Sequence, residues 1–466
     1  MRVEYYCGGR KRRVTVHRSR QAAPEPAGAG TTGRFLALTA DRPPALASHA
    51  DGEPEVILTS SIAVGEPTPS ELQWLQSRYG FTITREGSHG KVLLTAPPDS
   101  TEPERLAVKV AAEVFERGNV ALAQPNFVRV LDGLREAEAI GDGRWGFNNP
   151  GTPGVVGADV AATAAWTVTT GNSGIRVAVI DDGVQASHPA LTGTVVAQAD
   201  YVEKNPDGTP GSDATPPNHN DFHGTACAGI IAGRDPLMQG LAFAVSLVAC
   251  RVGSKNLGGW VADDFDVADG IDWCWQQGQA DVLSLSWNGG PPDDLRTSSF
   301  KRAMTQGRHG KGCAVIAAAG NTGGPVVYPA KLDGVVAVGA SNQWDQRKTE
   351  TSKDHDKPPW ASNVGPELAL IAPGVAIATI GLIGSVGVGP GGLRSHFSGT
   401  SASAPFVSAA AALILSVRDD LKAAEVVEIL ERSADSPEAS HKRNSDVGFG
   451  RLNAYSALRL ARRWPS

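Results

Sequence analysis

Three short segments of this chain place an aspartate, a histidine and a serine where an apolar run ends or a helix begins. Asp181 follows the apolar run 175–180, His223 opens a helix of small residues, and Ser401 opens another. A serine hydroxyl is a weak nucleophile at neutral pH, so it needs a base with a pKa of about 7, and histidine supplies one. A carboxylate must then hold the imidazole in one tautomer and stabilise its cation. Asp181, His223 and Ser401 are therefore predicted to be the catalytic residues of nucleophilic acyl transfer.

An oxyanion formed during acyl transfer needs hydrogen-bond donors, and the same segments offer two. The backbone N–H of Ser401 stands at the positive end of its helix dipole. Asn321 directly follows the apolar run 313–318 and can add a side-chain amide to the oxyanion hole. The local pattern around Asn321 fits a structural asparagine equally well.

These residues need a scaffold, and the apolar runs between them define it. Near-continuous runs of Val, Ile, Leu and Ala alternate with helical segments, which is typical of a mostly parallel sheet buried on both faces. In such a sheet, functional groups gather beyond the carboxyl ends of the strands. We predict an α/β domain over residues 136–466, with helices on both faces of the sheet and strands at 175–180, 245–250, 281–285, 313–318, 334–338 and 368–371.

Residues 1–135 have a different texture from the rest of the chain. The stretch 21–53 is rich in Ala, Pro, Gly and Thr and indicates a linker. The segments after it follow the order βαββαβ, which is typical of a small α+β domain of the ferredoxin-like kind. The expected strands lie at 55–60, 81–84, 91–95 and 120–130, and the expected helices lie at 70–79, capped by Ser70, and at 102–117.

Composition argues against several other classes of protein. Lys and Arg number 43 and Asp and Glu number 49, so the net charge of −6 provides no basic field for nucleic acid. The five cysteines are widely spaced and indicate neither a disulfide framework nor a metal knuckle. The uncharged run 368–393 is rich in glycine, so we interpret it as a buried strand and a loop rather than a membrane span. We expect no export signal at the N-terminus, and the sequence predicts no compartment.

Four short motifs surround the candidate residues, in the order Asp, His, Asn, Ser: Ile180-Asp-Asp-Gly, His223-Gly-Thr-Ala-Cys-Ala-Gly, Ala319-Gly-Asn321 and Gly399-Thr-Ser-Ala-Ser-Ala-Pro405. These motifs and their order resemble those of the subtilisin-like serine proteases, and their details are nearest to the kexin-like branch. The resemblance implies a serine endopeptidase that forms an acyl-enzyme and is synthesised as a self-processing zymogen. It also likens residues 1–135 to the family's propeptide. The implied partners are polypeptide substrates and the chain's own propeptide.

The resemblance further implies where a peptide substrate would bind. The cleft would be lined by the segment after the run 281–285 and the segment before Asn321, with the residues Ser286, Trp287, Gly289, Ala319 and Gly320. Asp182 and Asp221 would lie on the non-primed side, although Asp182 fits a turn equally well. The carboxylates at 263, 264 and 266 would either attract a Lys or Arg at P2 or P4 of the substrate, or cap the helix that follows them.

No cofactor is required for the chemistry that these motifs imply. In subtilisins the aspartate after a His-Pro pair ligates calcium, and that position is Ala190 here, so this calcium site is expected to be missing while a structural calcium elsewhere stays open. Cys227 is expected to be a buried thiol rather than a second nucleophile. The acidic segment 354–356 is expected to be a solvated loop rather than a metal site, and the G-x-G-x-x-G run 387–392 a loop rather than a nucleotide site. A catalytically silent, peptide-binding pseudoprotease is the competing class.

Overall fold

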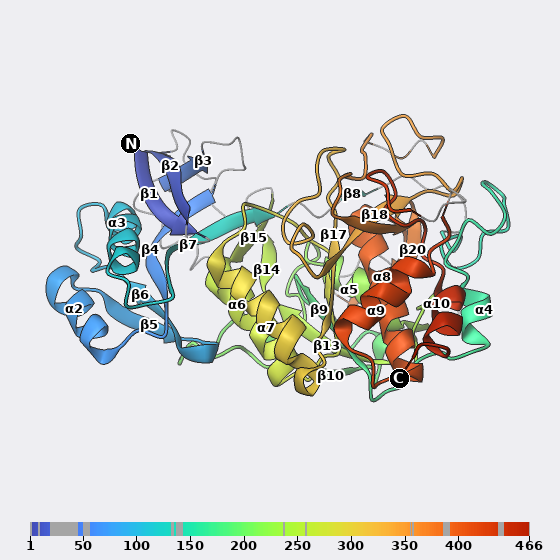
Figure 1. Ribbon diagram of the computed structural model, residues 1–466, viewed down its shortest axis with the longest axis horizontal. Helices are drawn as coiled ribbons and strands as arrows, with labels where there is room; N and C mark the ends of the chain where they lie inside the picture. Colours follow the sequence, from blue (N-terminus) through green and yellow to red (C-terminus); the bar gives the residue numbers. More distant parts are fainter. Residues whose placement is uncertain are drawn as a thin grey trace.

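The computed structural model describes residues 2–7, 10–18, 45–49, 56–131, 135–136, 143–235, 238–256, 259–354, 356, 358–384, 392–436 and 442–465. A smaller α+β unit, which carries the N-terminus, lies beside a larger α/β unit, which carries the C-terminus (Figure 1).

A seven-stranded parallel sheet forms the centre of the larger unit. Its strands, in spatial order, are β10 (Val195–Asp200), β13 (Ser246–Arg251), β9 (Arg176–Asp181), β16 (Val282–Leu285), β17 (Ala314–Ala318), β18 (Val335–Ser341) and β19 (Leu368–Pro373). All six predicted strands are present, so the predicted α/β fold with a parallel sheet is confirmed. The sequence did not reveal the edge strand β10, because its apolar residues are interrupted by polar ones and Val196 is 50% exposed.

Helices cover both faces of this sheet because alternate residues of each strand point to opposite sides. Val177 and Val179 of β9 join one core, whereas Ala178 and Ile180 join the other. The first core packs under α4 (Ala162–Trp166), α5 (His223–Ala232), α8 (Thr400–Val417), α9 (Ala423–Arg432) and α10 (Ala454–Ala461), and the second packs under α6 (Asp264–Gln276) and α7 (Asp294–Gly310).

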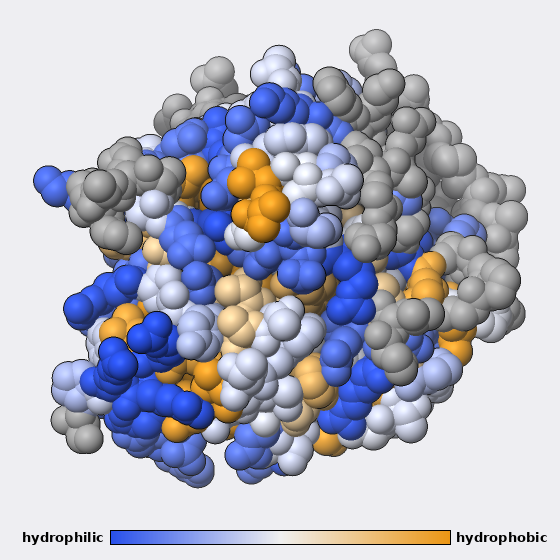
Figure 2. Space-filling model, turned by 90° about the vertical axis from the view of Figure 1, so that its right-hand side faces the viewer, coloured by the Kyte–Doolittle hydropathy of each residue, from blue (hydrophilic) through white to orange (hydrophobic). Residues whose placement is uncertain are grey.

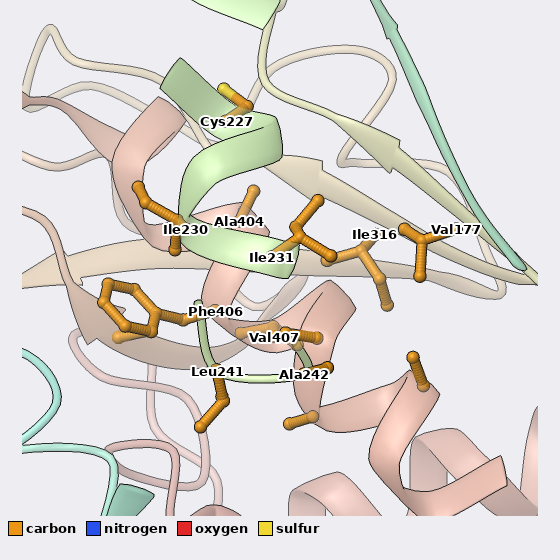
Figure 3. Packing of buried hydrophobic residues seen from close by; sticks show 14 of the residues in the cluster. Val177, Cys227, Ile230, Ile231, Leu241, Ala242, Ile316, Ala404, Phe406 and Val407 are labelled. Carbon is orange, nitrogen blue, oxygen red and sulfur yellow. The ribbon is translucent and has the colours of Figure 1, made fainter. Parts of the chain in front are cut away.

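The long helix α8 occupies the middle of the first core. Figure 3 shows Ile231 of α5 beside Val407 of α8, with Ile316 of β17 next to them. Within the described part of the chain, α8 is the one helix long and apolar enough to cross a membrane, and 89% of that stretch is buried inside the protein. The end of the larger unit seen in Figure 2 is mostly hydrophilic, with hydrophobic residues in small separate patches.

The smaller unit has the predicted βαββαβ order and the sheet order β7-β4-β6-β5, which is the ferredoxin-like arrangement. The prediction that Ser70 caps the first helix is wrong: Thr68 is the N-cap, and it forms a capping box with Glu71. The elements are β4 (Val56–Gly65), α2 (Pro69–Tyr79), β5 (Thr82–Glu86), β6 (Lys91–Thr95), α3 (Pro103–Glu116) and β7 (Leu122–Leu131).

Three further strands, β1 (Arg2–Cys7), β2 (Arg10–Arg18) and β3 (Ala45–His49), extend this sheet from β4. The expected linker 21–53 is therefore interrupted by a strand at 45–49, and its other residues lie outside the described ranges.

Strands from the larger unit continue the sheet of the smaller one. β7 pairs with β15 (Gly259–Asp263), which pairs with β14 (Gly253–Asn256). A second, smaller sheet joins β20 (Ile377–Ile380), β21 (Leu393–Ser398) and β8 (Arg135–Glu136), so the expected boundary at 135/136 falls inside β8. The run 368–393 accordingly contains β19 and β20 and the start of β21, while residues 385–391, including most of the glycine-rich motif, lie outside the described ranges.

Candidate active site

The predicted site residues gather at the carboxyl edge of the parallel sheet, where the physical rule for α/β folds puts them. Asp181 ends β9, His223 opens α5, Asn321 follows β17, and Ser401 lies in the first turn of α8. Nδ1 of His223 lies 2.8 Å from Oδ1 of Asp181, and both residues are buried. Phe397 packs edge-on against the imidazole, with ring centroids 5.2 Å apart. The ring of His223 is thus held by a carboxylate on one side and an aromatic side chain on another.

The helix that carries His223 is capped from outside its own sequence. Phe222, its N-cap residue, offers no side-chain acceptor, and Asp182 supplies one instead. The two oxygens of Asp182 accept the N–H groups of His223 (3.1 Å) and Gly224 (2.7 Å). A side chain at Gly224 would collide with the backbone of Gly183, so glycine is required for this close approach. Asp182 therefore fixes the start of α5, and burial together with Asp181 raises its pKa.

A proline in α8 frees the backbone carbonyl of Ser401. Pro405 has no N–H, so the helical bond from residue 405 to the carbonyl of Ser401 cannot form. That carbonyl accepts instead from the Ser286 hydroxyl at 2.9 Å and lies 3.7 Å from Sγ of Cys227. In return, Oγ of Ser401 donates to the carbonyl of Ser286 at 2.6 Å. Ser401 is thereby tied to the segment after β16.

Cys227 links Ser401 to the aspartate–histidine pair. Ligand atoms of Cys227, Asp181 and His223 all lie within 4.8 Å of one another. The thiol is fully buried, and burial raises its pKa well above the ordinary value, so it stays protonated. Nε2 of His223 makes no hydrogen bond within the described residues, so it is available to accept a proton.

Asn321 is oriented by Thr400, the residue before the serine. The backbone N–H and the hydroxyl of Thr400 both donate to Oδ1 of Asn321, at 2.9 and 3.0 Å. Because a backbone N–H can only donate, the atom that it meets must be the amide oxygen, and Nδ2 remains as the donor. This is the orientation that an oxyanion donor requires.

Asn363 is a functional candidate that the sequence analysis missed. Its Nδ2 donates to the carbonyls of Ala319 (3.1 Å) and Pro325 (2.8 Å), and its Oδ1 accepts from the N–H of Thr322. These bonds brace the loop on both sides of Asn321. Its motif, 362–366, is polar and lies between two strands, but its partners are about 40 residues away in sequence, so only the fold reveals them.

The residues predicted to line the substrate cleft are near the site, but several side chains are engaged elsewhere. Trp287 is buried, and its Nε1 donates to the carbonyl of Ile180, so only its backbone remains for a substrate. The N–H of Gly289 donates to the carbonyl of Tyr328. Ser286 binds Ser401, as described above, while Ala319 and Gly320 form the loop that Asn363 braces. Their contact with substrate stays a prediction.

Asp221 is buried and bound to backbone and side-chain donors. It accepts from the N–H of Lys255 at 2.6 Å and from Nδ2 of Asn218 at 2.7 Å. It therefore connects the loop before His223 to β14. Like that of Asp182, its substrate-binding role stays a prediction.

The acidic residues at the start of α6 have the geometry of the capping alternative, with additional partners. Asp263 is the N-cap and accepts from the N–H groups of Phe265 and Asp266. Asp264 and Asp266 instead pair with arginines of the smaller unit, Arg129 and Arg85. The start of α6 is therefore part of the contact between the two units.

The two positions that the sequence raises for metal binding, Ala190 and the described residues of the segment 354–356, have other contacts in the structure. Ala190 is buried, and its side chain has no oxygen that could bind calcium. Its backbone N–H donates to Nδ1 of His188. The expectation of a solvated loop at 354–356 is wrong for its two aspartates: Asp354 is buried in an ion pair with Lys348 (2.7 Å), and Asp356 accepts from Nε1 of Trp360. Among the described residues, the one cluster of metal-type ligands is the Asp181–His223–Cys227 group itself.

A buried aspartate–histidine pair, a serine at a helix N-terminus and an oriented amide, all at one edge of a parallel sheet, define the class of serine hydrolase sites. The chain belongs to the subtilase family, because the model of that family matches residues 172–450. The chain is 31% identical over 440 residues to a "Calcium-dependent protease" of a Nostoc species, an alignment that covers 85% of this chain and 62% of that protein. It is also 32% identical to thermitase of Thermoactinomyces vulgaris, over 64% of this chain and 93% of thermitase.

The fold agrees with these relatives. The structure of fervidolysin from Fervidobacterium pennivorans, described as a keratinolytic enzyme related to subtilisin, superposes with a TM-score of 0.66 at 22% identity, covering 88% of this chain and 62% of fervidolysin. This chain thus spans about three fifths of the length of the calcium-dependent protease of Nostoc.

Proposed function

We propose that this chain is a serine endopeptidase that acts through Asp181, His223 and Ser401. The observation that carries this proposal is the 2.8 Å Asp181–His223 pair, buried beside the backbone of Ser401. The subtilase relatives support it, since they are named as proteases.

In this mechanism, Oγ of Ser401 attacks the scissile carbonyl while Nε2 of His223 takes its proton. Asp181 stabilises the imidazolium through Nδ1. Nδ2 of Asn321 and the N–H of Ser401 bind the oxyanion of the tetrahedral intermediate. Collapse expels the amine, which receives the proton from His223, and leaves an acyl-enzyme. Water then attacks the acyl group with the same proton transfers and restores Ser401.

A fluorophosphonate probe tests the proposal, because only an activated serine is labelled. We expect labelling and peptidase activity in the wild-type protein and neither in Ser401→Ala. Peptide binding without either signal would support the competing pseudoprotease class.

We further propose that residues 1–135 act as a propeptide that the enzyme removes itself. β7 ends at Leu131, which is opposite Trp260 of β15, and the chain resumes with Arg135 opposite Ser398, three residues before Ser401. The chain is therefore paired with β15 before residues 132–134 and, after them, with β21, which leads into α8 and Ser401. This supports a cut between Leu131 and Arg135.

Mass analysis and N-terminal sequencing of the purified protein beside its Ser401→Ala variant test self-processing. We expect a new N-terminus between 132 and 135 in the wild type alone. Equal masses after prolonged incubation, with peptidase activity present, would refute it.

Calcium takes no part in this mechanism. The relative called a calcium-dependent protease makes structural calcium reasonable for the family, but the residues at Ala190 do not fit a calcium ion. The motifs around Asp181, His223, Asn321 and Ser401 support the further proposal that the chain is nearest to the kexin-like branch.

A further inference from the structure

One buried arginine adjoins the strand that ends in Asp181. Arg251 is the last residue of β13, and the parallel pairing of β13 with β9 puts it opposite Asp181. The contact between the strands continues for one more residue, because the N–H of Val252 donates to the carbonyl of Asp181 at 2.9 Å. Arg251 is 2% exposed, so its guanidinium lies inside the protein. The side chain therefore starts from a backbone position that is fixed relative to Asp181.

The guanidinium of Arg251 connects this strand to the loop that leads into His223. Its Nη2 lies 3.5 Å from Oδ2 of Asp221, which precedes His223 by two residues. Its Nη1 donates to Oδ2 of Asp200, at the end of the edge strand β10, at 2.9 Å. Burial of a guanidinium is costly unless carboxylates compensate its charge, and these two acids do so. Arg251 thus ties the loop before α5 to the carboxyl ends of β13 and β10.

The turn after Asp181 packs between Arg251 and the start of α5. A Cβ at Gly183 would lie 3.1 Å from Cδ of Arg251, and the φ of +115° also favours glycine there. On its other side, the carbonyl of Gly183 approaches Gly224 so closely that a side chain at residue 224 would collide with it. A change in the position of Arg251 would therefore be felt by both segments that it adjoins.

Three carboxylates of the site repel one another, and Arg251 compensates one of them. Burial, and after it the charges of Asp181 and Asp221, raise the pKa of Asp182, so these three groups lie close enough to interact. Burial also raises the pKa of Asp221, while the attraction of Arg251 is among the interactions that lower it. Without the guanidinium, Asp221 would turn away from the other two acids, and the loop before α5 would move with it.

We propose that Arg251 is a positioning residue that sets the place of His223 relative to Asp181 by holding Asp221. This inference rests on the proposed function. The backbone of Arg251 is in register with Asp181, and its guanidinium holds the loop that carries His223. A single residue thus fixes both members of the pair whose Nδ1–Oδ1 distance is 2.8 Å. The sequence did not reveal this role, because Asp200 lies 51 residues from Arg251 and only the fold brings the acids to it.

Arg251→Lys is the first test variant, because lysine keeps the positive charge but not the fork. One ammonium group cannot hold Asp200 and Asp221 in the way that the two terminal nitrogens of Arg251 do. The variants are compared by hydrolysis of fluorescently labelled casein, and a fluorophosphonate probe counts the active sites. We expect kcat per labelled site to fall by about 10- to 100-fold, the effect of a misplacement of about 1 Å, while KM changes little.

Asp221→Asn tests the same contact from the other partner. Asparagine keeps an oxygen for the N–H of Lys255 and loses the charge that attracts Arg251. We expect the same fall in kcat, and we expect the double variant to lose no more than the slower single variant, because both changes break one contact. Losses that multiply in the double variant would overturn the inference. A raised KM with normal kcat in Asp221→Asn would also overturn it and make Asp221 a substrate-binding residue.

Arg308→Lys is the matched control, since it makes the same change at another largely buried arginine of the larger unit. Nε of Arg308 donates to Asp281 at 3.0 Å, and Asp281 precedes β16, at the amino edge of the sheet and away from the site. This variant should have a lower melting temperature and an unchanged kcat per labelled site. A fall in kcat as large as that of Arg251→Lys would overturn the inference.

The wild-type protein and Ser401→Ala separate this inference from the proposed function. Full kcat in Arg251→Lys, with Ser401-dependent labelling and casein hydrolysis intact, would overturn the role of Arg251 and leave the proposed function standing. Absence of Ser401-dependent labelling and hydrolysis in the wild-type protein would overturn both.

Discussion

At the scale of single residues, two adjacent aspartates have different tasks because their carboxylates meet different donors. Asp181 faces the imidazole of His223, whereas Asp182 accepts two backbone N–H groups of α5, the helix that carries His223. The residue types of the site could be predicted from sequence, since the chemistry dictates them. Which of the two aspartates binds His223 and which caps α5 could not be predicted, because this depends on where α5 begins relative to β9.

Asp182→Asn should separate a positioning role from a substrate-binding role. An amide has one oxygen, so one of the two N–H groups would face an NH₂ group, at a cost of about 1–3 kcal/mol in the free energy of unfolding. Because His223 moves with its helix, kcat should fall while KM changes little. Denaturant unfolding and steady-state kinetics measure both. A raised KM with normal stability would instead indicate that Asp182 binds substrate.

Asn321→Ala should lower kcat by about 10² to 10³, the loss found when one oxyanion donor is removed. KM should change little, since the donor acts on the oxyanion of the transition state. Thr400→Val is the matched control: it keeps the backbone N–H that orients Asn321 and removes the hydroxyl, which donates to Asn321 and accepts from the N–H of Gly320, so its loss should be smaller. Near-wild-type kcat in Asn321→Ala would remove Asn321 from the mechanism.

At the scale of elements, the strands of the parallel sheet were predictable because each is a continuous apolar run. β14 and β15 were not predicted, because Gly253–Asn256 and Gly259–Asp263 have no such run and form strands by pairing with each other and with β7. In α8, the decisive feature is the proline that interrupts helical bonding at Ser401. It exchanges one helical hydrogen bond for contacts with Ser286 and Cys227.

Pro405→Ala should affect stability and activity in opposite directions. Alanine favours a helix by about 3 kcal/mol over proline, so α8 should not be weakened. Its new N–H would compete for the carbonyl of Ser401 and draw it away from Ser286. Misplacement of about 1 Å can cost about 10²-fold, so kcat should fall by up to that factor while the melting temperature holds or rises. A variant with unchanged kcat would show that the freed carbonyl has no role in placing Ser401.

At the scale of the whole molecule, the two units are joined by buried charges as well as by a shared sheet. Lys91 of the smaller unit lies 2.8 Å from Asp272 of α6, and Arg85 pairs with Asp266 and Asp269. Charge composition alone could not predict this contact, because the cations and the carboxylates lie about 180 residues apart in the chain. Loss of one partner of such a buried ion pair strongly destabilises the folded protein, because the other charge is left buried without compensation.

His89 should make the contact between the units sensitive to pH. It stacks on Trp275 at 5.9 Å and contacts Gln276, and burial lowers its pKa below the ordinary value of 6.5, against the attraction of Asp272. When the two units are separated, His89 binds a proton at a higher pH than it does when they are in contact. The contact between the units therefore weakens as the pH falls below about 6.5.

The full-length Ser401→Ala variant is suited to this measurement, because the proposed self-processing requires Ser401. Its melting temperature should fall more between pH 7.5 and 5.5 than that of the same protein with His89→Asn. Asparagine suits the positive φ of 56° at this position, so the control keeps the turn. An identical pH response in the two proteins would exclude His89 as the sensitive group.

The arginine contact at the start of α6 also bears on how such a chain can change over generations. Because Arg129 belongs to the smaller unit and Asp264 to the larger one, a mutation of either residue loosens the contact between the units unless the other residue changes in step. A substitution on one side of this contact is then tolerated only together with a compensating substitution on the other side. Exchange of the smaller unit between relatives should accordingly succeed when residues 129 and 264 are exchanged together, and fail when they are not.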